Sequence, residues 1–276
     1  MNNLGRSPTE SVPVMSFTLA LALLPALALG GALGFLGGLF GIGGGILAIP
    51  VLVLGYGLDQ ATAQGTALVM MVPNLAVAWW RYVRRNPVTL RGALAVAVVA
   101  TLTTWAAARL AQGLDQQVLR VVFALFLAAL GVGQLGRLAA PQDGSRGVEP
   151  APPSRARSPR LVPLVGLLGG GSMGLLGVGG GLVATPVLTG WFRLGQRAAQ
   201  SMALALVTPS SAMALAAYAQ GGRVDWPVGC ALAVGGVLTV SLGVTAAHAC
   251  SERTLQRLFG AMLIATAAIL IAKMVA

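Results

Sequence analysis

Two glycine-rich segments hold the residues of this chain that are best suited to bind a small ligand. They run over residues 34–52 and 170–188, and each contains a glycine triplet followed five residues later by a proline. The triplets are Gly43, Gly44 and Gly45 in the first segment and Gly179, Gly180 and Gly181 in the second. A helix that breaks at glycine leaves backbone N–H groups free, and the N-terminus of the following half-helix carries a positive dipole. Both features favour a small anion, so the predicted chemistry is reversible binding and not catalysis.

The two segments are copies of each other. At a constant offset of 136 residues, 11 of 19 aligned positions are identical, including six glycines and the proline. The offset continues without a gap through the pairs Gln64 and Gln200, and Pro73 and Pro209. We therefore predict a tandem duplication. The predicted parts are a cytoplasmic or disordered tail (1–16), a first transmembrane repeat (17–138), a Pro- and Arg-rich cytoplasmic linker (139–160) and a second transmembrane repeat (161–276).

The composition indicates a membrane protein. Hydrophobic residues make up 56% of the chain, charged residues 9%, and the mean hydropathy is +0.82, a balance that the charged surface of a soluble domain does not allow. The 18 basic residues outnumber the 7 acidic ones, and they flank apolar runs instead of lining one polar face. This distribution is typical of the positive-inside rule, so the predicted surroundings are a lipid bilayer and no nucleic-acid partner is expected.

The elements that must position the glycine triplets are transmembrane helices. Residues 17–55 form an uncharged run of 39 residues, about 58 Å of helix, against a hydrocarbon core of about 30 Å. The helix must therefore break, and the triplet is where we place the break. Six further spans are predicted at 61–80, 92–108, 118–135, 198–218, 228–249 and 255–271. The predicted fold is an all-α polytopic membrane protein with two repeats of four principal helices, eight in total, the first helix of each repeat being broken.

An alternative with ten segments remains open, because the broken helix could cross the membrane twice. Four crossings per repeat would make the repeats parallel, and five would make them inverted. The side with the excess of positive charge carries 12 of the 18 basic residues in the first version and 13 in the second, so charge favours neither. Both versions place the loop at residues 81–91 and the central linker in the cytoplasm.

Uncharged polar residues and prolines accompany the two breaks. The predicted substrate-binding residues are Gly43, Gly44, Gly45, Gln64, Thr66, Asn74, Gly179, Gly180, Gly181, Gln200, Ser201 and Ser210. The predicted hinges are Pro50, Pro73, Pro186 and Pro209, each of which removes a backbone donor. The alternative for the polar side chains is hydrogen bonding between neighbouring helices. The outer glycines of each segment (Gly34, Gly38, Gly170 and Gly174) are predicted to serve close helix packing.

Other polar residues are interpreted as structural. Tyr82 and Tyr218, with the nearby tryptophans, are expected at the membrane interface. No acidic residue falls within a predicted span, so a proton relay through buried carboxylates is not visible. Ser172 lies in a G-x-S-x-G sequence, but its apolar helical flanks lack the strand-to-helix elbow of a hydrolase. We therefore expect no enzyme, no catalytic residue, no cofactor and no metal site.

The duplicated motif resembles that of a known family. The pattern G-x-G-G-G-x-x-x-x-P-x-L, followed by A-x-x-x-G-T-A-L over residues 61–68, resembles the TauE/SafE family of sulfite exporters. The resemblance covers nearly the whole chain apart from the tail and the linker. It implies a multi-pass protein of the bacterial inner membrane with about eight helices. It also implies a transporter, and by the family's name an exporter, of a small sulfur-containing or organic anion such as sulfite or a sulfonate.

Three functional hypotheses follow. The leading one is a secondary transporter that moves a small anion by alternating access through a site between the two breaks. The second is an anion channel with the same lining, and the third is a membrane scaffold that transports nothing. Proton and sodium both remain open as the coupling ion, and a homo-oligomer is one of the open assembly states.

Overall fold

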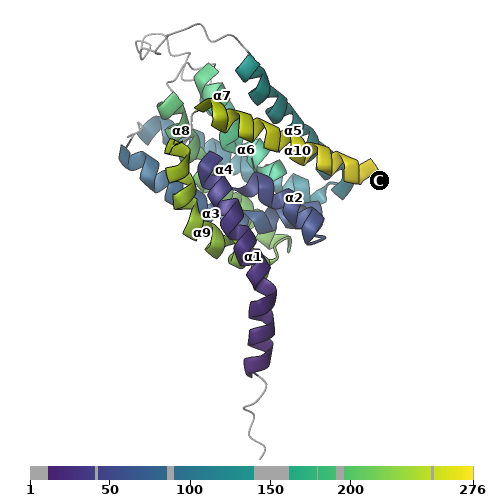
Figure 1. Ribbon diagram of the computed structural model, residues 1–276. Helices are drawn as coiled ribbons and strands as arrows, with labels where there is room; N and C mark the ends of the chain where they lie inside the picture. The colour runs from purple at the N-terminus through teal and green to yellow at the C-terminus, as the bar shows by residue number, and fades with distance from the viewer. Residues whose placement is uncertain are drawn as a thin grey trace, which may run out of the picture.

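The protein is an assembly of packed α-helices. The computed structural model describes residues 12–40, 43–85, 90–139, 162–178, 180–190, 196–249 and 252–275. Within those ranges the chain forms ten helices and no strand (Figure 1). The first half contributes α1 (Val12–Phe40), α2 (Gly45–Gly55), α3 (Gln60–Arg85), α4 (Leu90–Gly113) and α5 (Gln116–Ala139). The second half contributes α6 (Val162–Leu176), α7 (Gly180–Gly190), α8 (Gln196–Gln220), α9 (Trp226–Ala249) and α10 (Glu252–Val275). The all-helical fold predicted from the sequence is confirmed.

Each half contains a helix break at its glycine triplet, as predicted. The break separates α2 from α1 and α7 from α6, so each half has five helical segments instead of four principal helices. α2 and α7 have 11 residues each, about 16 Å of helix, which is too short to cross a hydrocarbon core of about 30 Å. α1 begins at Val12, so residues 12–16, which were expected to belong to the tail, are helical. The first turns of α1 project from the packed body (Figure 1).

The long helices have the length and surface of membrane spans. Five stretches within the described helices are long and apolar enough to cross a membrane: 23–40, 60–80, 116–133, 202–220 and 226–246. Large apolar side chains point outward from several helices, for example Leu102 at 65% exposure and Leu238 at 69%. In a bilayer such side chains face lipid, so their exposure indicates a membrane-embedded surface. The apolar outer surface therefore agrees with the apolar composition of the sequence.

The two halves interlock through parallel helix pairs. α1 packs along α9, and α6 packs along α4, so the first helix of each half lies against the fourth helix of the other half. Glycines of α1 and α6 let the backbones touch, and the pairs are Gly30 with Leu232, Gly34 with Gly236, Gly38 with Val240, Gly166 with Val96, Gly170 with Ala100 and Gly174 with Thr104. Residue numbers rise together along both members of each pair, so the paired helices run parallel. Each of the three glycine contacts of one pair recurs in the other at the 136-residue offset.

The packing role predicted for the outer glycines is therefore confirmed. An added Cβ at any of these positions would meet the backbone of the facing helix. α3 and α8 lie side by side at the centre, α3 also contacts α2 and α9, and α8 also contacts α4 and α7. α5 and α10 pack against each other. This arrangement places α3 and α8, with their internal prolines, between the two breaks.

Candidate functional site

The first helix break lies between α1 and α2 and requires glycine at two positions. Gly43 and Gly44 have φ angles of 72° and 85°, a region in which residues with a side chain are strained. A Cβ on Gly44 would also lie 2.7 Å from the carbonyl oxygen of Leu33 in α1. The Gly44 carbonyl accepts hydrogen bonds from Leu47 N and Ala48 N at 3.2 and 3.1 Å and so begins α2. The chain thus folds back against α1 at this point.

The second helix break repeats this arrangement between α6 and α7. Gly177 has a φ of 68° and donates its N–H to the Met173 carbonyl at 2.9 Å, which ends α6. α7 begins at Gly180, where a Cβ would lie 3.0 Å from the Gly169 carbonyl oxygen of α6. Gly179 lies outside the described residues. This break too folds back against its own preceding helix.

The two breaks meet each other beside α3. A Cβ on Gly45, at the start of α2, would come within 2.9 Å of Val178 Cγ1 in the second break. A Cβ on Gly177 would lie 3.0 Å from the Cβ of Gln64 in α3. Two segments that are 136 residues apart in sequence therefore converge on one helix. We name this region the break junction, defined by Gly43–Gly45, Gly177–Val178 and the adjoining part of α3.

α3 carries three buried amide side chains, two of which contact this junction. At 3.6 residues per turn, Gln60, Gln64 and Asn74 fall within an arc of about 80° on one side of the helix, which we name the amide face. Their exposed fractions are 0%, 0% and 1%. Asn74 Nδ2 donates to the Gly43 carbonyl of the first break at 3.5 Å. The amide face therefore contacts the first break through Asn74 and the second through Gln64.

Several polar atoms of the amide face are buried without a partner. Both amide atoms of Gln60, the Nε2 of Gln64 and the Oδ1 of Asn74 have no hydrogen-bond partner among the described residues. A buried polar group left unpaired costs about 1–3 kcal/mol. A polar ligand that paired with these atoms would remove that cost, so the amide face is the part of the junction best suited to bind one.

Tyr218 of α8 completes this arrangement. Its side chain is fully buried, and its hydroxyl lies 2.7 Å from Gln64 Oε1 and 3.1 Å from the Gly174 carbonyl oxygen. The interpretation of Tyr218 as an interfacial residue is therefore wrong. Trp79, Trp80 and Trp226 are 38%, 55% and 49% exposed, which agrees with an interfacial position. Tyr82 has no described side chain.

The remaining predicted residues lie around the junction in different roles. Thr66 is buried on α3, and its Oγ1 accepts a hydrogen bond from Asp225 N at 2.9 Å, so it holds the α8–α9 connection. Ser210 is buried on α8 and donates to the Leu206 carbonyl of its own helix at 2.8 Å. Gly181 is the second residue of α7, where a Cβ would lie 3.5 Å from Val207. Gln200 and Ser201 belong to α8, but their side chains lie outside the described part of the chain. The predicted hinges Pro50, Pro73, Pro186 and Pro209 lie within α2, α3, α7 and α8.

Ser172 makes a hydrogen bond within its own helix. Its hydroxyl donates to the Gly169 carbonyl of α6 at 3.0 Å. Because both flanks of Ser172 are helical, the strand-to-helix elbow that exposes a nucleophilic serine is not formed here. The G-x-S-x-G sequence is therefore part of helix packing.

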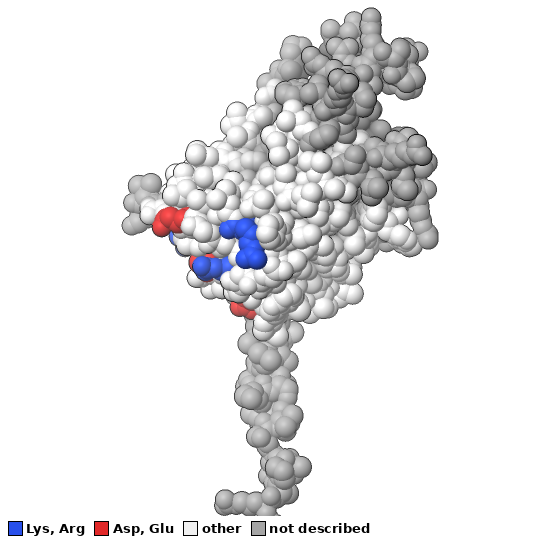
Figure 2. Space-filling model, turned by 180° about the vertical axis from the view of Figure 1, so that it is seen from behind, with Lys and Arg blue, Asp and Glu red and all other residues white. Residues whose placement is uncertain are grey.

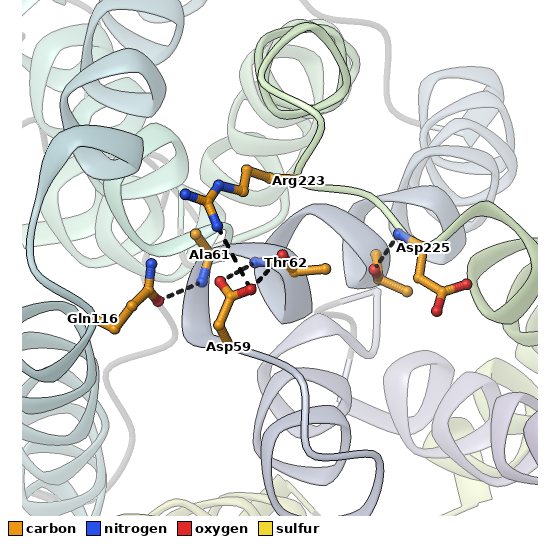
Figure 3. A network of polar contacts seen from close by, with 7 residues as sticks. Asp59, Ala61, Thr62, Gln116, Arg223 and Asp225 are labelled. Carbon is orange, nitrogen blue, oxygen red and sulfur yellow. Dashed lines mark hydrogen bonds and ion pairs between the residues drawn. The ribbon is translucent and has the colours of Figure 1, made fainter.

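A second polar network joins the connections at one end of the bundle. α3, α5 and α9 begin at this end next to Asp59, Asp115 and Asp225, and we name it the aspartate face. Asp59 Oδ1 accepts from Thr62 N at 3.0 Å, and Asp59 Oδ2 lies 3.6 Å from Arg223 Nη1 (Figure 3). In Figure 2 the coloured charged side chains gather in one region, while the rest of the described surface in that view is uncharged.

Two more hydrogen bonds extend the network across the aspartate face (Figure 3). Ala61 N donates to Gln116 Oε1 at 3.2 Å, which joins α3 to the α4–α5 connection. The bond from Asp225 N to Thr66 joins α3 to the α8–α9 connection. Gly65 allows this approach, because a Cβ there would meet the carbonyl oxygen of Arg223. The start of α3 is thus fastened to two connections, one from each half.

Gln60, Tyr218 and the aspartate-face network were not predicted as functional. Gln60 could have been found, because it lies four residues before Gln64 and so on the same side of the helix. The pairing of Asp59 with Arg223 joins residues that are far apart in the chain and carries no local signal. The pairing of Tyr218 with Gln64 also joins residues that are far apart in the chain and carries no local signal.

The fold and the junction together define a class of protein. Interlocked repeats, membrane-length apolar helices and paired helix breaks are features of polytopic transport proteins. Residues 26–270 match the family described as sulfite exporter TauE/SafE, and the chain belongs to that family. It is a multi-pass protein of the bacterial inner membrane.

Similar curated proteins carry transporter names. A "probable membrane transporter protein" of Xylella fastidiosa strain 9a5c is 30% identical over 250 residues, which cover 89% of this chain and 94% of that protein. The corresponding protein of strain Temecula1 is 29% identical with the same coverage. A "probable membrane transporter protein" of Methanocaldococcus jannaschii is 27% identical over 177 residues, or 61% of this chain and 62% of that protein. No solved structure matches the chain.

Proposed function

We propose that the protein is a secondary transporter that exports a small sulfur-containing or organic anion, such as sulfite or a sulfonate, by alternating access. The observation that carries this proposal is the meeting of the two helix breaks beside a buried amide face with unpaired polar atoms. A helix break inside a membrane is tolerated only where protein or a water-filled site covers its polar groups. The family membership and the names of the relatives support transport of this kind.

The direction of the helices supports inverted repeats. The aspartate face lies where α3 begins and α4 ends, so the linker after α5 leaves from the opposite end, which we name the linker face. α6 runs parallel to α4 and so starts at the linker face, whereas α1 runs parallel to α9 and starts at the aspartate face. The two halves then cross the membrane in opposite senses, which is the arrangement on which alternating access is built in many carriers.

The charge distribution agrees with this topology. With ten segments, 13 of the 18 basic residues fall at the linker face. By the positive-inside rule the linker face is then cytoplasmic, and the aspartate face lies on the outer side of the membrane.

Transport into proteoliposomes tests the proposal. Purified protein is reconstituted, and uptake of labelled sulfite, methanesulfonate and acetate is measured at several pH values, with and without a sodium gradient. We expect accumulation of at least one anion against its concentration gradient when the correct ion gradient is imposed. Equilibration without accumulation would indicate a channel, and the absence of any flux would favour a scaffold.

The aspartate-face network is proposed as the outer gate of this transporter. It fastens connections of both halves to the start of α3. The duplication does not repeat it at the linker face, since the positions equivalent to Asp59, Thr66 and Arg223 are Gly195, Met202 and Pro87. These residues are therefore specific to the aspartate face, where the described structure has their contacts formed.

Removing the Asp59 charge is expected to loosen this gate. Asp59→Asn keeps a side chain that can cap α3 but weakens the attraction to Arg223, and both partners are more than a third exposed. An exposed ion pair contributes about 0–1 kcal/mol, so the open population should rise by up to about fivefold. The measurement is the rate at which an impermeant thiol reagent labels Ala63→Cys, a buried position of α3, in a background without Cys230 and Cys250.

Asp115→Asn is the matched control for the gate. Asp115 also caps a helix at the aspartate face, with hydrogen bonds from Gln117 N and Val118 N, and no ion pair is described for it. Its replacement should leave labelling unchanged. Equal labelling in Asp59→Asn and in the parent would show that the ion pair does not hold the outer side closed.

A further inference from the structure

Gln60 is a buried amide side chain for which the described structure offers no partner. Its exposed fraction is 0%, and neither Nε2 nor Oε1 has a hydrogen bond among the described residues. Burial of an unpaired amide opposes folding, so a residue of this kind is explained by a ligand or an ordered water that pairs with it. Gln60 is the first residue of α3, where the positive end of the helix dipole favours negative charge.

Gln64 lies one turn further along the same side of α3, and one of its two amide atoms has no described hydrogen-bond partner. Its Oε1 is engaged by the Tyr218 hydroxyl at 2.7 Å, while its Nε2 has no partner. Because an amide is planar, holding the oxygen on Tyr218 fixes the direction of the NH₂ group. Gln60 and Gln64 thus place two amide side chains one turn apart on the amide face, and their NH₂ groups can donate hydrogen bonds without carrying a charge.

The carboxylate nearest this pair has partners of its own. The carboxylate of Asp59, next to Gln60 in the chain, accepts hydrogen bonds from the backbone and hydroxyl of Thr62 and faces Arg223. The negative charge of Asp59 is therefore already compensated. The other described acidic residues of this face, Asp115 and Asp225, cap α5 and α9.

The sequence duplication singles out the same three residues. At the 136-residue offset, Gln60, Gln64 and Tyr218 correspond to Gln196, Gln200 and Tyr82, so all three residue types recur. Other polar residues near them do not recur, since Thr66 corresponds to Met202 and Asn74 to Ser210. A set that is retained in both halves while its neighbours diverge is expected for residues that serve the transported solute.

We propose that Gln60 and Gln64 bind the oxyanion group of the transported solute, a sulfite, sulfonate or carboxylate, through their amide NH₂ groups, and that Tyr218 is a positioning residue for Gln64. This assignment rests on the proposed transport of an anion. Gln196, Gln200 and Tyr82 form the equivalent set of the second half. Neutral donors bind an anion firmly enough to select it and leave no fixed charge to hold it when the site opens on the other side.

Anion-dependent thermal stability tests the assignment without relying on transport. The melting temperature of the full-length protein in detergent is measured with sodium sulfite, methanesulfonate or acetate, against sodium chloride at equal ionic strength. At ten times its Kd, a bound anion should raise the Tm of the wild type by about 3–6 °C. Gln60→Leu should weaken binding by about 10- to 100-fold, the usual effect of losing a hydrogen bond to a charged group. Gln60→Glu should abolish it by repulsion.

Thr104→Val is the matched control for removal of a buried polar group. Thr104 is fully buried on α4, and its hydroxyl donates to the Gly170 carbonyl of α6 at 2.9 Å, so it belongs to a different hydrogen bond from those of Gln60 and Gln64. This variant should lower the Tm while keeping the full anion dependence. If no anion stabilises the wild type, or if Gln60→Glu is stabilised as much as the wild type, water fills the position and the proposal is wrong. Binding without flux would instead overturn the proposed transport and leave Gln60 and Gln64 as an anion-binding pair.

A double-mutant cycle tests the role of Tyr218. Tyr218→Phe should raise the anion concentration that gives half of the maximal Tm shift by about 3- to 10-fold, because Gln64 loses its fixed orientation. In a Gln64→Leu background the same change should have no further effect on that concentration. A purely structural tyrosine would lower the Tm equally in both backgrounds without moving the anion concentration, and that result would contradict the positioning role.

Discussion

Replacement of Gly44 by alanine is expected to abolish transport and to destabilise the protein. Two effects add at this position. The φ of 85° is strained by about 1–2 kcal/mol for an L-residue with a side chain. The new methyl group would also lie 2.7 Å from the Leu33 carbonyl oxygen, and overpacking of this kind costs about 1–3 kcal/mol. The start of α2 must then move away from α1, which displaces the junction from the amide face. Proteoliposome flux and the Tm measured together check this prediction.

Gly57→Ala is the control that separates the two effects. Gly57 has a φ of 67°, but nothing lies within 4 Å of the position of its Cβ. Its replacement should cause only the strain of about 1–2 kcal/mol and should leave flux intact. The loss of stability in Gly180→Ala should lie between the losses in Gly57→Ala and Gly44→Ala, because its Cβ would lie 3.0 Å from the Gly169 carbonyl oxygen. Normal flux in Gly44→Ala would mean that the geometry of the first break is not required for transport.

The positions of the two breaks could be predicted from sequence because their causes are local. A glycine triplet inside an apolar run that is too long for one span must mark an interruption. The contacts between the breaks could not be predicted. Gly45 and Val178 meet because α3 lies beside both breaks, and that depends on how the two halves interlock. In a membrane protein, hydrophobic periodicity is only a weak indicator of which residues are buried, since lipid and protein interior are both apolar.

The position of Tyr218 could not be predicted from local sequence either. A tyrosine close to the end of an apolar helix has the sequence pattern of an interfacial anchor. Its partner Gln64 lies 154 residues earlier in the chain, and only the packing of α8 on α3 brings the two together. Gln64 itself was predicted as a binding residue because its repeat partner and the nearby proline are visible in the sequence. Local features therefore located one member of the pair, and tertiary structure is needed for the other.

Replacement of Gly34 by leucine is expected to prevent assembly of the two halves. In α1 the Cβ position of Gly34 already meets the backbone of Gly236 in α9, so no rotamer of a larger side chain avoids the facing helix. Without water as a driving force, helices in membranes are held by close packing, and separating α1 from α9 removes those contacts along the whole pair. We expect a loss of about 3 kcal/mol or more and failure to purify as a monodisperse species. Size-exclusion chromatography in detergent and the Tm check this.

Gly31→Ala is the matched control on the same helix, because it adds a methyl group to a neighbouring glycine that has space for it. The nearest atom to its Cβ position is Thr239 Cγ2 at 3.6 Å, an ordinary contact, and alanine favours a helix over glycine by about 1 kcal/mol. This variant should be as stable as the wild type or more stable. Gly170→Leu should fail as Gly34→Leu does, since it meets Ala100 of α4 at the equivalent crossing. If Gly34→Leu and Gly31→Ala behaved alike, the parallel crossing of α1 and α9 would not be what holds the halves together, and the direction assigned to the repeats would lose its support.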